Sequence, residues 1–282
     1  MKTTWKILRR RPSRIVGLIL LIFFTLMAIF GPLLYPNMTA VNSQQIYAAP
    51  SIHHLLGTDY AGRDIWVQIV QGAQNVMFVA ALGALFTIVI GTVVGLAAGY
   101  LGSIVDSILM RITDIFLTVP SITLTIILAV TIGLTNYFVM AAILSFASWG
   151  GLARAIRSMV MSVRERSFVE VSLGLGLSRA RILMLDVLPN LLPYIIVHLM
   201  LALTSTVYAE VGLFYLGVVP FKADNWGVML NYATGGSGAM YSTQSIMFLL
   251  SPILAIVLLQ TGIVLTSDAV NEIVDPRLRT AG

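Results

Sequence analysis

The chain has no cysteine and only three histidines among its 282 residues. This scarcity excludes a disulfide framework, a thiolate zinc cluster and a thiol nucleophile. Charged residues are scarce as well, at 10%, whereas 58% of residues are hydrophobic and the mean hydropathy is +0.92. Such a composition lies far from that of soluble domains and indicates an integral membrane protein. The net charge of +5 does not indicate nucleic-acid binding, because the basic residues flank apolar runs.

Catalytic motifs are also missing. A phosphate-binding loop requires lysine after glycine, and none of the three lysines, Lys2, Lys6 and Lys222, follows one. The sequence has no HExxH or GxSxG motif, and no convincing catalytic pair of extramembrane carboxylates near a histidine. We therefore expect a protein that is not an enzyme and binds no cofactor or metal itself. Transport, anchoring or signalling remains, with energy from a gradient or from a partner.

Long hydrophobic runs predict the fold. About 20 apolar residues in a helix span a hydrocarbon core of about 30 Å, and six segments meet this requirement. They cover about 15–35, 76–100, 104–133, 137–156, 191–216 and 245–267. We predict an all-α membrane protein with six spans, the first a retained anchor rather than a cleaved signal. Gly83, Gly91, Gly95 and Gly99 share one face of the second span, which we expect to pack against another helix. Pro120 predicts a kink in the third.

Basic residues predict the orientation. With the N-terminus inside and six spans, every lysine and arginine except Arg63 and Lys222 lies on or near the cytoplasmic side. The reverse orientation would invert this bias, so both termini are predicted to be cytoplasmic. The stretch 36–74 then forms a long external loop, and 217–243 forms a second external stretch.

One basic, glycine-punctuated stretch stands out between the fourth and fifth spans. Its apolar residues are too many for a solvated loop: Phe168, Val169, Val171, Leu173 and Leu175. Glycines at 174 and 176 exclude a long helix, so we predict a short helix, a turn, and a second short helix with Ser178 as N-cap. Pro189 marks the start of the fifth span. An apolar knob rimmed by arginines suits a groove on another protein, and a hairpin lying on anionic lipid is the alternative.

Ionisable residues within the spans are few. Asp114 is expected to pair with Arg111, one turn earlier on the same helix. Glu210 lies deeper, and an interhelical hydrogen bond or an outer-gate contact is preferred over a proton site. An ion-coupled secondary carrier and a membrane scaffold without transport stay open as alternatives at this point.

The glycine-punctuated stretch resembles a known motif. Glu170-Val-Ser-x-x-x-Gly176, followed after nine residues by Asp186-Val-Leu-Pro189, is similar to the E-A-A-x-x-x-G-x9-I-x-L-P loop of ABC importer permeases. The chain departs from that pattern at Val171, Ser172 and Asp186.

Further segments resemble the permeases of the dipeptide, oligopeptide and nickel importer group, in particular the second, C-type subunit. They are 54–64 (HLLGTDYAGRD), 110–120, 210–217 (EVGLFYLG) with Trp226-Gly227, and 275–279 (DPRLR).

This resemblance implies a type I ABC importer permease fold in the cell membrane of a prokaryote. It divides the chain into 1–75, with the tail, first span and external loop, and a five-helix core, 76–282, that contains a cytoplasmic coupling segment at 158–189. It also implies a heterodimer with a paralogous permease, two ATPase subunits that bind ATP and Mg²⁺, and an extracytoplasmic solute-binding protein. Peptides are the expected cargo, with oligosaccharides or nickel chelates as alternatives.

The same resemblance assigns roles to residues. Glu170 would orient the coupling loop and Gly176 would allow its turn. The full set expected to couple to the ATPase is Phe168, Val169, Glu170, Gly174, Gly176, Leu177, Ser178 and Arg181. The gate or pathway candidates are Asp114, Pro120, Glu210 and Trp226. Asp59, Arg63 and Asp64 are candidates for the receptor dock, and a self-bonded turn is at least as good an explanation of these three.

Overall fold

A computed structural model describes residues 11–35, 41–134, 136–219, 225–235 and 245–274. Lys222, the glycines at 236 and 238 and the tail 275–279 lie outside these residues. The described chain is helical apart from its loops and one isolated β-bridge between Thr58 and Asp64. Its elements are α2 (Pro12–Leu34), η1 (Ser43–Gln45), α3 (Ile65–Leu101), α4 (Ser103–Thr118), α5 (Ser121–Ile132), α6 (Tyr137–Phe146), α7 (Gly150–Arg164), α8 (Ser167–Gly174), α9 (Arg179–Ile182), η2 (Leu183–Val187), α10 (Leu188–Tyr215), α11 (Trp226–Gly235) and α12 (Ile246–Val274).

Within the described residues, four helices are long and apolar enough to cross a membrane, and two bent pairs raise the number to six if each counts as one span. The four are α2, α3, the continuous helix from Arg179 to Tyr215, and α12. The pairs are α4 with α5, and α6 with α7, with bends of 91° and 51°. The all-helical membrane fold is therefore confirmed, whereas six complete spans stay a prediction.

The two bends have different local causes. At the first, Val119 has extended backbone before Pro120, as the proline ring requires, and the predicted kink becomes a complete break. At the second, the span predicted over about 137–156 consists of two helices, α6 and α7, that meet at a bend the sequence did not indicate. The Ser148 hydroxyl donates to the Leu144 carbonyl at 2.8 Å there, and such back-bonding by serine favours bending.

Helix α3 lies at the centre of the fold. It begins at Ile65, so the predicted division of the chain after residue 75 lies inside this helix. The predicted glycine face is confirmed. A Cβ at Gly91 would come within 2.9 Å of Leu152, and one at Gly95 within 2.6 Å of the Ala153 carbonyl, both on α7. Gly83 lies in the same way against Thr206 of α10. The small residues let three helix backbones approach closely.

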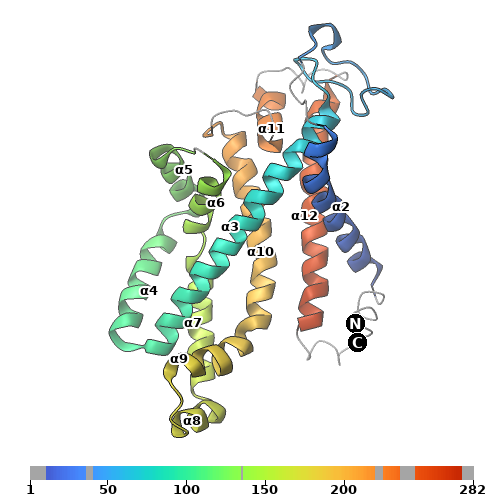
Figure 1. Cartoon of the computed structure of the whole chain (residues 1–282). Coiled ribbons are helices and arrows are strands. Elements are labelled where there is room, and N and C mark those ends of the chain that lie inside the picture. Colours follow the sequence, from blue (N-terminus) through green and yellow to red (C-terminus); the bar gives the residue numbers. More distant parts are fainter. Residues whose placement is uncertain (1–10, 36–40, 135, 220–224, 236–244, 275–282) are drawn as a thin grey trace.

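The first and last long helices lie side by side on the far side of α3 from α4 and α5 (Figure 1). Gly17 of α2 lies against Leu265 of α12, and Gly262 of α12 lies against Leu20 of α2. Arg14 at the start of α2 forms an ion pair with Glu272 near the end of α12. The loop 41–64 lies at the top of Figure 1 and α8 at the bottom, so the two loop regions singled out in the sequence occupy opposite ends of the molecule.

Candidate coupling and gating sites

The glycine-punctuated segment folds as a short helix, a turn and a second helix, as predicted. Helix α8 ends in a Schellman motif, in which the Leu177 amide donates to the Ser172 carbonyl (3.2 Å) and the Gly176 amide to the Leu173 carbonyl (3.0 Å). Gly176 has a φ of +73°, in the left-handed region that favours glycine. Ser178 caps α9 by accepting from the Arg181 amide at 3.4 Å. The second helix is longer than expected, because α9, η2 and α10 form one continuous helix.

One side of α8 anchors the segment to the membrane helices. Val169 is fully buried in a cluster with Val160 of α7, Ile182 of α9 and Leu191 of α10. The Ser172 hydroxyl donates to Asp186 Oδ2 of η2 at 2.8 Å. These contacts give α8 a fixed position relative to the start of α10.

The other side of α8 presents apolar surface. The exposed large residues are Phe168, Val171, Leu173 and Leu175, the last with 74% of its surface accessible. Glu170 is exposed beside them, and no other side chain in the described part of the chain bonds its carboxylate. The arrangement matches a knob that seats in a groove of another protein, because apolar groups this exposed gain free energy only when they are covered.

Glu210 lies at a junction of helices α10 and α11. It is fully buried, and Oε1 accepts a hydrogen bond from the Asn225 side-chain amide at 2.9 Å. Among the described residues, Glu210 Oε2 has no hydrogen-bond partner. Asn225 also accepts from the Gly227 amide at 2.8 Å. Glu210 of α10 therefore bonds the residue directly before α11, which agrees with the hydrogen bond between helical segments expected from the sequence.

Trp226 ties the same junction to α3. Its indole nitrogen donates to the Ile69 carbonyl at 3.0 Å, and its ring lies edge-on to Phe24 of α2 with 5.8 Å between centroids. Gly72 provides the space, since a Cβ there would lie 2.7 Å from the Trp226 ring. The side chain is fully buried, so in this conformation Trp226 is a packing residue and does not line an open path.

The ion pairs between α4 and α7 differ from expectation. Asp114 pairs with Arg154 at 2.5 Å rather than with Arg111. A second pair, Asp106 with Arg157, is bidentate, with oxygen–nitrogen distances of 2.5 and 2.6 Å. The prediction for Asp114 was wrong because it considered one helix alone, whereas α7 lies antiparallel beside α4 and offers both arginines.

Loop 41–64 is held together by the acidic residues of the predicted dock. Asp59 is fully buried and accepts from the Ala61 and Arg63 amides (2.8 and 2.9 Å), from Arg63 Nε (2.8 Å) and from Gln68 (3.0 Å). Burial alone would lower the pKa of Arg63, but the hydrogen bond and the charge of Asp59 outweigh burial and raise that pKa. Arg63 therefore keeps its positive charge beside the Asp59 carboxylate.

Asp64 has two structural contacts of its own. It caps α3 by accepting from the Val67 amide at 3.1 Å, and its other oxygen lies 2.8 Å from His54 Nδ1. Nearly all the polar capacity of Asp59, Arg63 and Asp64 is thus used inside the chain, as the self-bonded turn predicts. The loop also exposes large apolar side chains, among them Ile52 at 90% and Leu55 at 57% accessible.

Comparison with known proteins gives two family matches. Residues 91–280 match the family described as binding-protein-dependent transport system inner membrane component. Residues 1–50 match the N-terminal TM domain of oligopeptide transport permease C.

Individual relatives are similar over nearly the whole chain. The dipeptide transport system permease protein DppC of Bacillus subtilis (strain 168) is 32% identical over 98% of this chain and 85% of its own length. The oligopeptide transport system permease protein OppC of the same organism is 32% identical over 98% and 90%. A DppC of Alkalihalophilus pseudofirmus is 34% identical over 99% and 90%.

A solved structure shares the fold. The MetNI methionine ABC transporter in an inward-facing conformation aligns with a TM-score of 0.55 and 20% identity, over 75% of this chain and 98% of that one.

Proposed function

Because this chain belongs to the binding-protein-dependent transport system inner membrane components, we propose that it is a permease subunit of an ATP-driven importer of di- and oligopeptides. Relatives named for dipeptide and oligopeptide transport match it almost end to end, which supports the cargo class. The observation that carries the mechanism is the exposed apolar side of α8, placed just before the helix that leads into α10.

In this proposal α8 is the coupling helix. Phe168, Val171 and Leu173 enter a groove of a cytoplasmic ATPase subunit, and Val169 transmits the displacement to the cluster that joins α7, α9 and α10. The exposed carboxylate of Glu170 orients the contact. Closure of two ATPase subunits on ATP and Mg²⁺ then moves the membrane helices between inward-open and outward-open states. The chain itself performs no ATP chemistry.

The remaining partners follow from the same reading. A paralogous permease completes the pathway, and a solute-binding protein delivers the peptide to the end that carries loop 41–64. Asp59, Arg63 and Asp64 hold that loop in shape, and Ile52 and Leu55 provide its exposed apolar contact surface. If α8 lies in the cytoplasm, the start of α2 and the end of α12 face the cytoplasm too, because they lie at the same end of the molecule (Figure 1).

In this proposal, gating depends on the break between α4 and α5 and on the contacts between α10 and α11. The break at Pro120 lets α4 and α5 move separately, with the Asp114–Arg154 pair holding α4 to α7. The Glu210–Asn225 bond and the buried Trp226 hold α11 against α10 and α3. These residues act as fixed points about which the pathway opens.

Paired alanine substitutions of two glycines test the coupling role. A Cβ at either Gly174 or Gly176 meets nothing within 4 Å, but only Gly176 has a positive φ. Gly176→Ala therefore strains the turn by about 1–2 kcal/mol without a clash, whereas Gly174→Ala is accepted. We expect Gly176→Ala, and more strongly Gly176→Val, to reduce peptide uptake per ATP hydrolysed in the reconstituted transporter.

Assembly with the ATPase subunits is the control, measured by co-purification of each variant. Uptake unchanged in Gly176→Val would refute the coupling role. Equal losses in Gly174→Ala and Gly176→Ala would refute the geometric reason given for it.

A further inference from the structure

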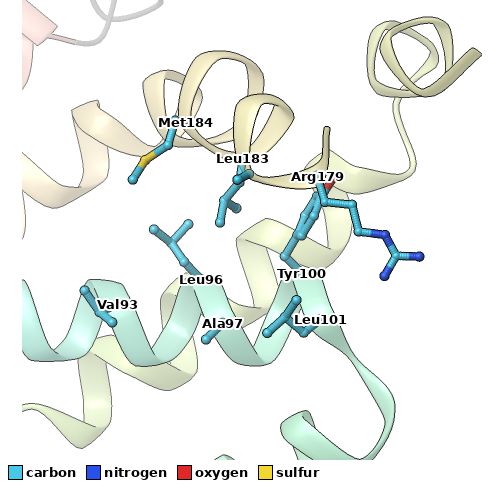
Figure 2. Close-up of a pocket in the computed structure, with 9 residues that line it drawn as sticks. Val93, Leu96, Ala97, Tyr100, Leu101, Arg179, Leu183 and Met184 are labelled. Carbon is cyan, nitrogen blue, oxygen red and sulfur yellow. The ribbon is translucent and has the colours of Figure 1, made fainter. Parts of the chain in front are cut away.

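An apolar groove of about 440 Å³ lies where the end of α3 faces α9 and η2. Its lining includes Val93, Ala97 and Tyr100 of α3, with Leu183 and Met184 of η2 opposite. Arg179 is the only charged residue among the nine that line it. Figure 2 shows Val93 and Met184 toward one end of the groove and Arg179 and Tyr100 toward the other. The groove is thus a long apolar slot with a cation at one end.

The groove opens to the surroundings at membrane depth. Val93 and Met184 are each 59% accessible, so neither wall is sealed by the chain itself. A 37-residue helix is about 55 Å long, which exceeds a hydrocarbon core of about 30 Å, so the last turns of α3 reach the headgroup region. Tyr100 and Arg179 are residue types that occupy this boundary. The apolar end of the slot therefore lies in the acyl layer and the arginine end among headgroups.

Charge at that end favours an anion. Arg179 lies in the lining at this end, and Arg164 points at the last carbonyls of α3, 3.5 Å from the oxygens of Gly99 and Tyr100. A guanidinium binds phosphate oxygens in a bidentate manner. Water would find almost no polar partner deeper in the slot, because its lining is apolar there. An acyl chain that carries an anionic headgroup matches both ends.

We propose that this groove is a binding site for one anionic phospholipid. The acyl chain lies between α3 and η2, and the phosphate contacts Arg179. Basic pockets between membrane helices on the cytoplasmic side are suited to such lipids; the assignment to the cytoplasmic leaflet rests on the orientation in the proposed function. Because η2 connects the α8–α9 segment to α10, the bound lipid lies beside the segment that transmits movement of α8.

Native mass spectrometry of the delipidated full chain tests this site, with phosphatidylglycerol and phosphatidylcholine added in equal amounts. We expect the wild-type chain to retain phosphatidylglycerol about fivefold better, from one arginine at the headgroup. Ala97→Phe fills the slot and should abolish specific retention of the lipid. Ala81→Phe makes the same change at an exposed position of α3 outside the groove and should leave retention unchanged.

Two arginine variants distinguish a specific contact with the lipid headgroup from nonspecific attraction of anionic lipid to basic residues. Arg179→Gln should lose the preference for phosphatidylglycerol, whereas Arg181→Gln, on the same short helix but outside the lining, should keep it. Neither surface substitution disturbs a buried contact, so these two variants test the role of Arg179 even if Ala97→Phe fails to fold.

Three outcomes overturn the proposal. They are equal retention of the two lipids by the wild-type chain, full competition by inorganic phosphate alone, and loss of the lipid when the transporter assembles, which would show that a partner subunit fills the groove. The first two outcomes are read from the isolated chain, so they do not depend on whether the chain transports peptides.

Discussion

The hydrogen bond between Ser172 and Asp186 allows a quantitative test of how α8 is held. These are two of the three positions at which the chain departs from the permease motif, where alanine and isoleucine are the pattern. The structure shows that the two departures belong together, since the Ser172 hydroxyl donates to Asp186 Oδ2 at 2.8 Å. A polar pair thus replaces the apolar one between α8 and η2.

The expected magnitude follows from the surroundings of the pair. A hydrogen bond to a charged group contributes about 1.5–3 kcal/mol when it is shielded from water. Both side chains are only partly buried, so water replaces part of the bond and about 1 kcal/mol is expected. This value corresponds to about a fivefold change in the equilibrium for local opening of α8.

Hydrogen exchange of the α8 amides in the full chain measures that opening. Ser172→Ala and Asp186→Ala should each accelerate exchange about fivefold, and the double variant should be no faster than either single one. Asp186→Asn is the matched control, because its side-chain oxygen still accepts the bond and exchange should change little. Ser172→Ala combined with Asp186→Ile restores the apolar pattern and should return exchange toward the wild-type rate.

Additive effects of the two alanine substitutions would refute the reasoning, since they would mean that the bond does not couple the two sites. Rapid exchange in Asp186→Asn would show instead that the charge, rather than the bond, holds α8.

Two further predictions concern the membrane helices. Glu210→Gln should leave the thermal unfolding temperature close to that of wild type, because glutamine still accepts from Asn225, whereas Glu210→Leu leaves that buried amide unpaired and should destabilise the chain by about 1–3 kcal/mol; equal losses would show that the charge is needed. Gly95→Ala should lower the unfolding temperature by forcing α3 away from the Ala153 carbonyl, at about 1–3 kcal/mol, while Gly212→Ala, which meets nothing within 4 Å, should not.

Local rules predicted much of the fold. The glycine face of α3, a change of direction at Pro120, the turn at Gly176 and the cap at Ser178 each depend on a few neighbouring residues, and the structure confirms all four, with a larger bend at Pro120 than the predicted kink. Backbone geometry at glycine and proline is decided within one or two turns, so a sequence contains enough information to locate it.

Contacts between distant segments were harder to predict. Asp106 and Asp114 lie on α4, and Arg154 and Arg157 lie three residues apart on α7. The sequence therefore showed the spacing of the two acidic residues and of the two arginines. What the sequence did not supply was the antiparallel placement of α7 beside α4. Helix α11 was missed as well, because its ten residues sit in a stretch interpreted as a glycine-rich external loop.

The ion pair between Arg14 and Glu272 has a consequence for synthesis of the chain. The later half of α2 meets α3 early, through Gly31 against Val70. The earlier half, with Gly17, packs on α12, which emerges roughly 200 residues later. At about 5–20 residues per second this delay is about 10–40 s. During that interval the first helix is inserted but only half paired, and its small-residue face and Arg14 stay open until the last helix is made.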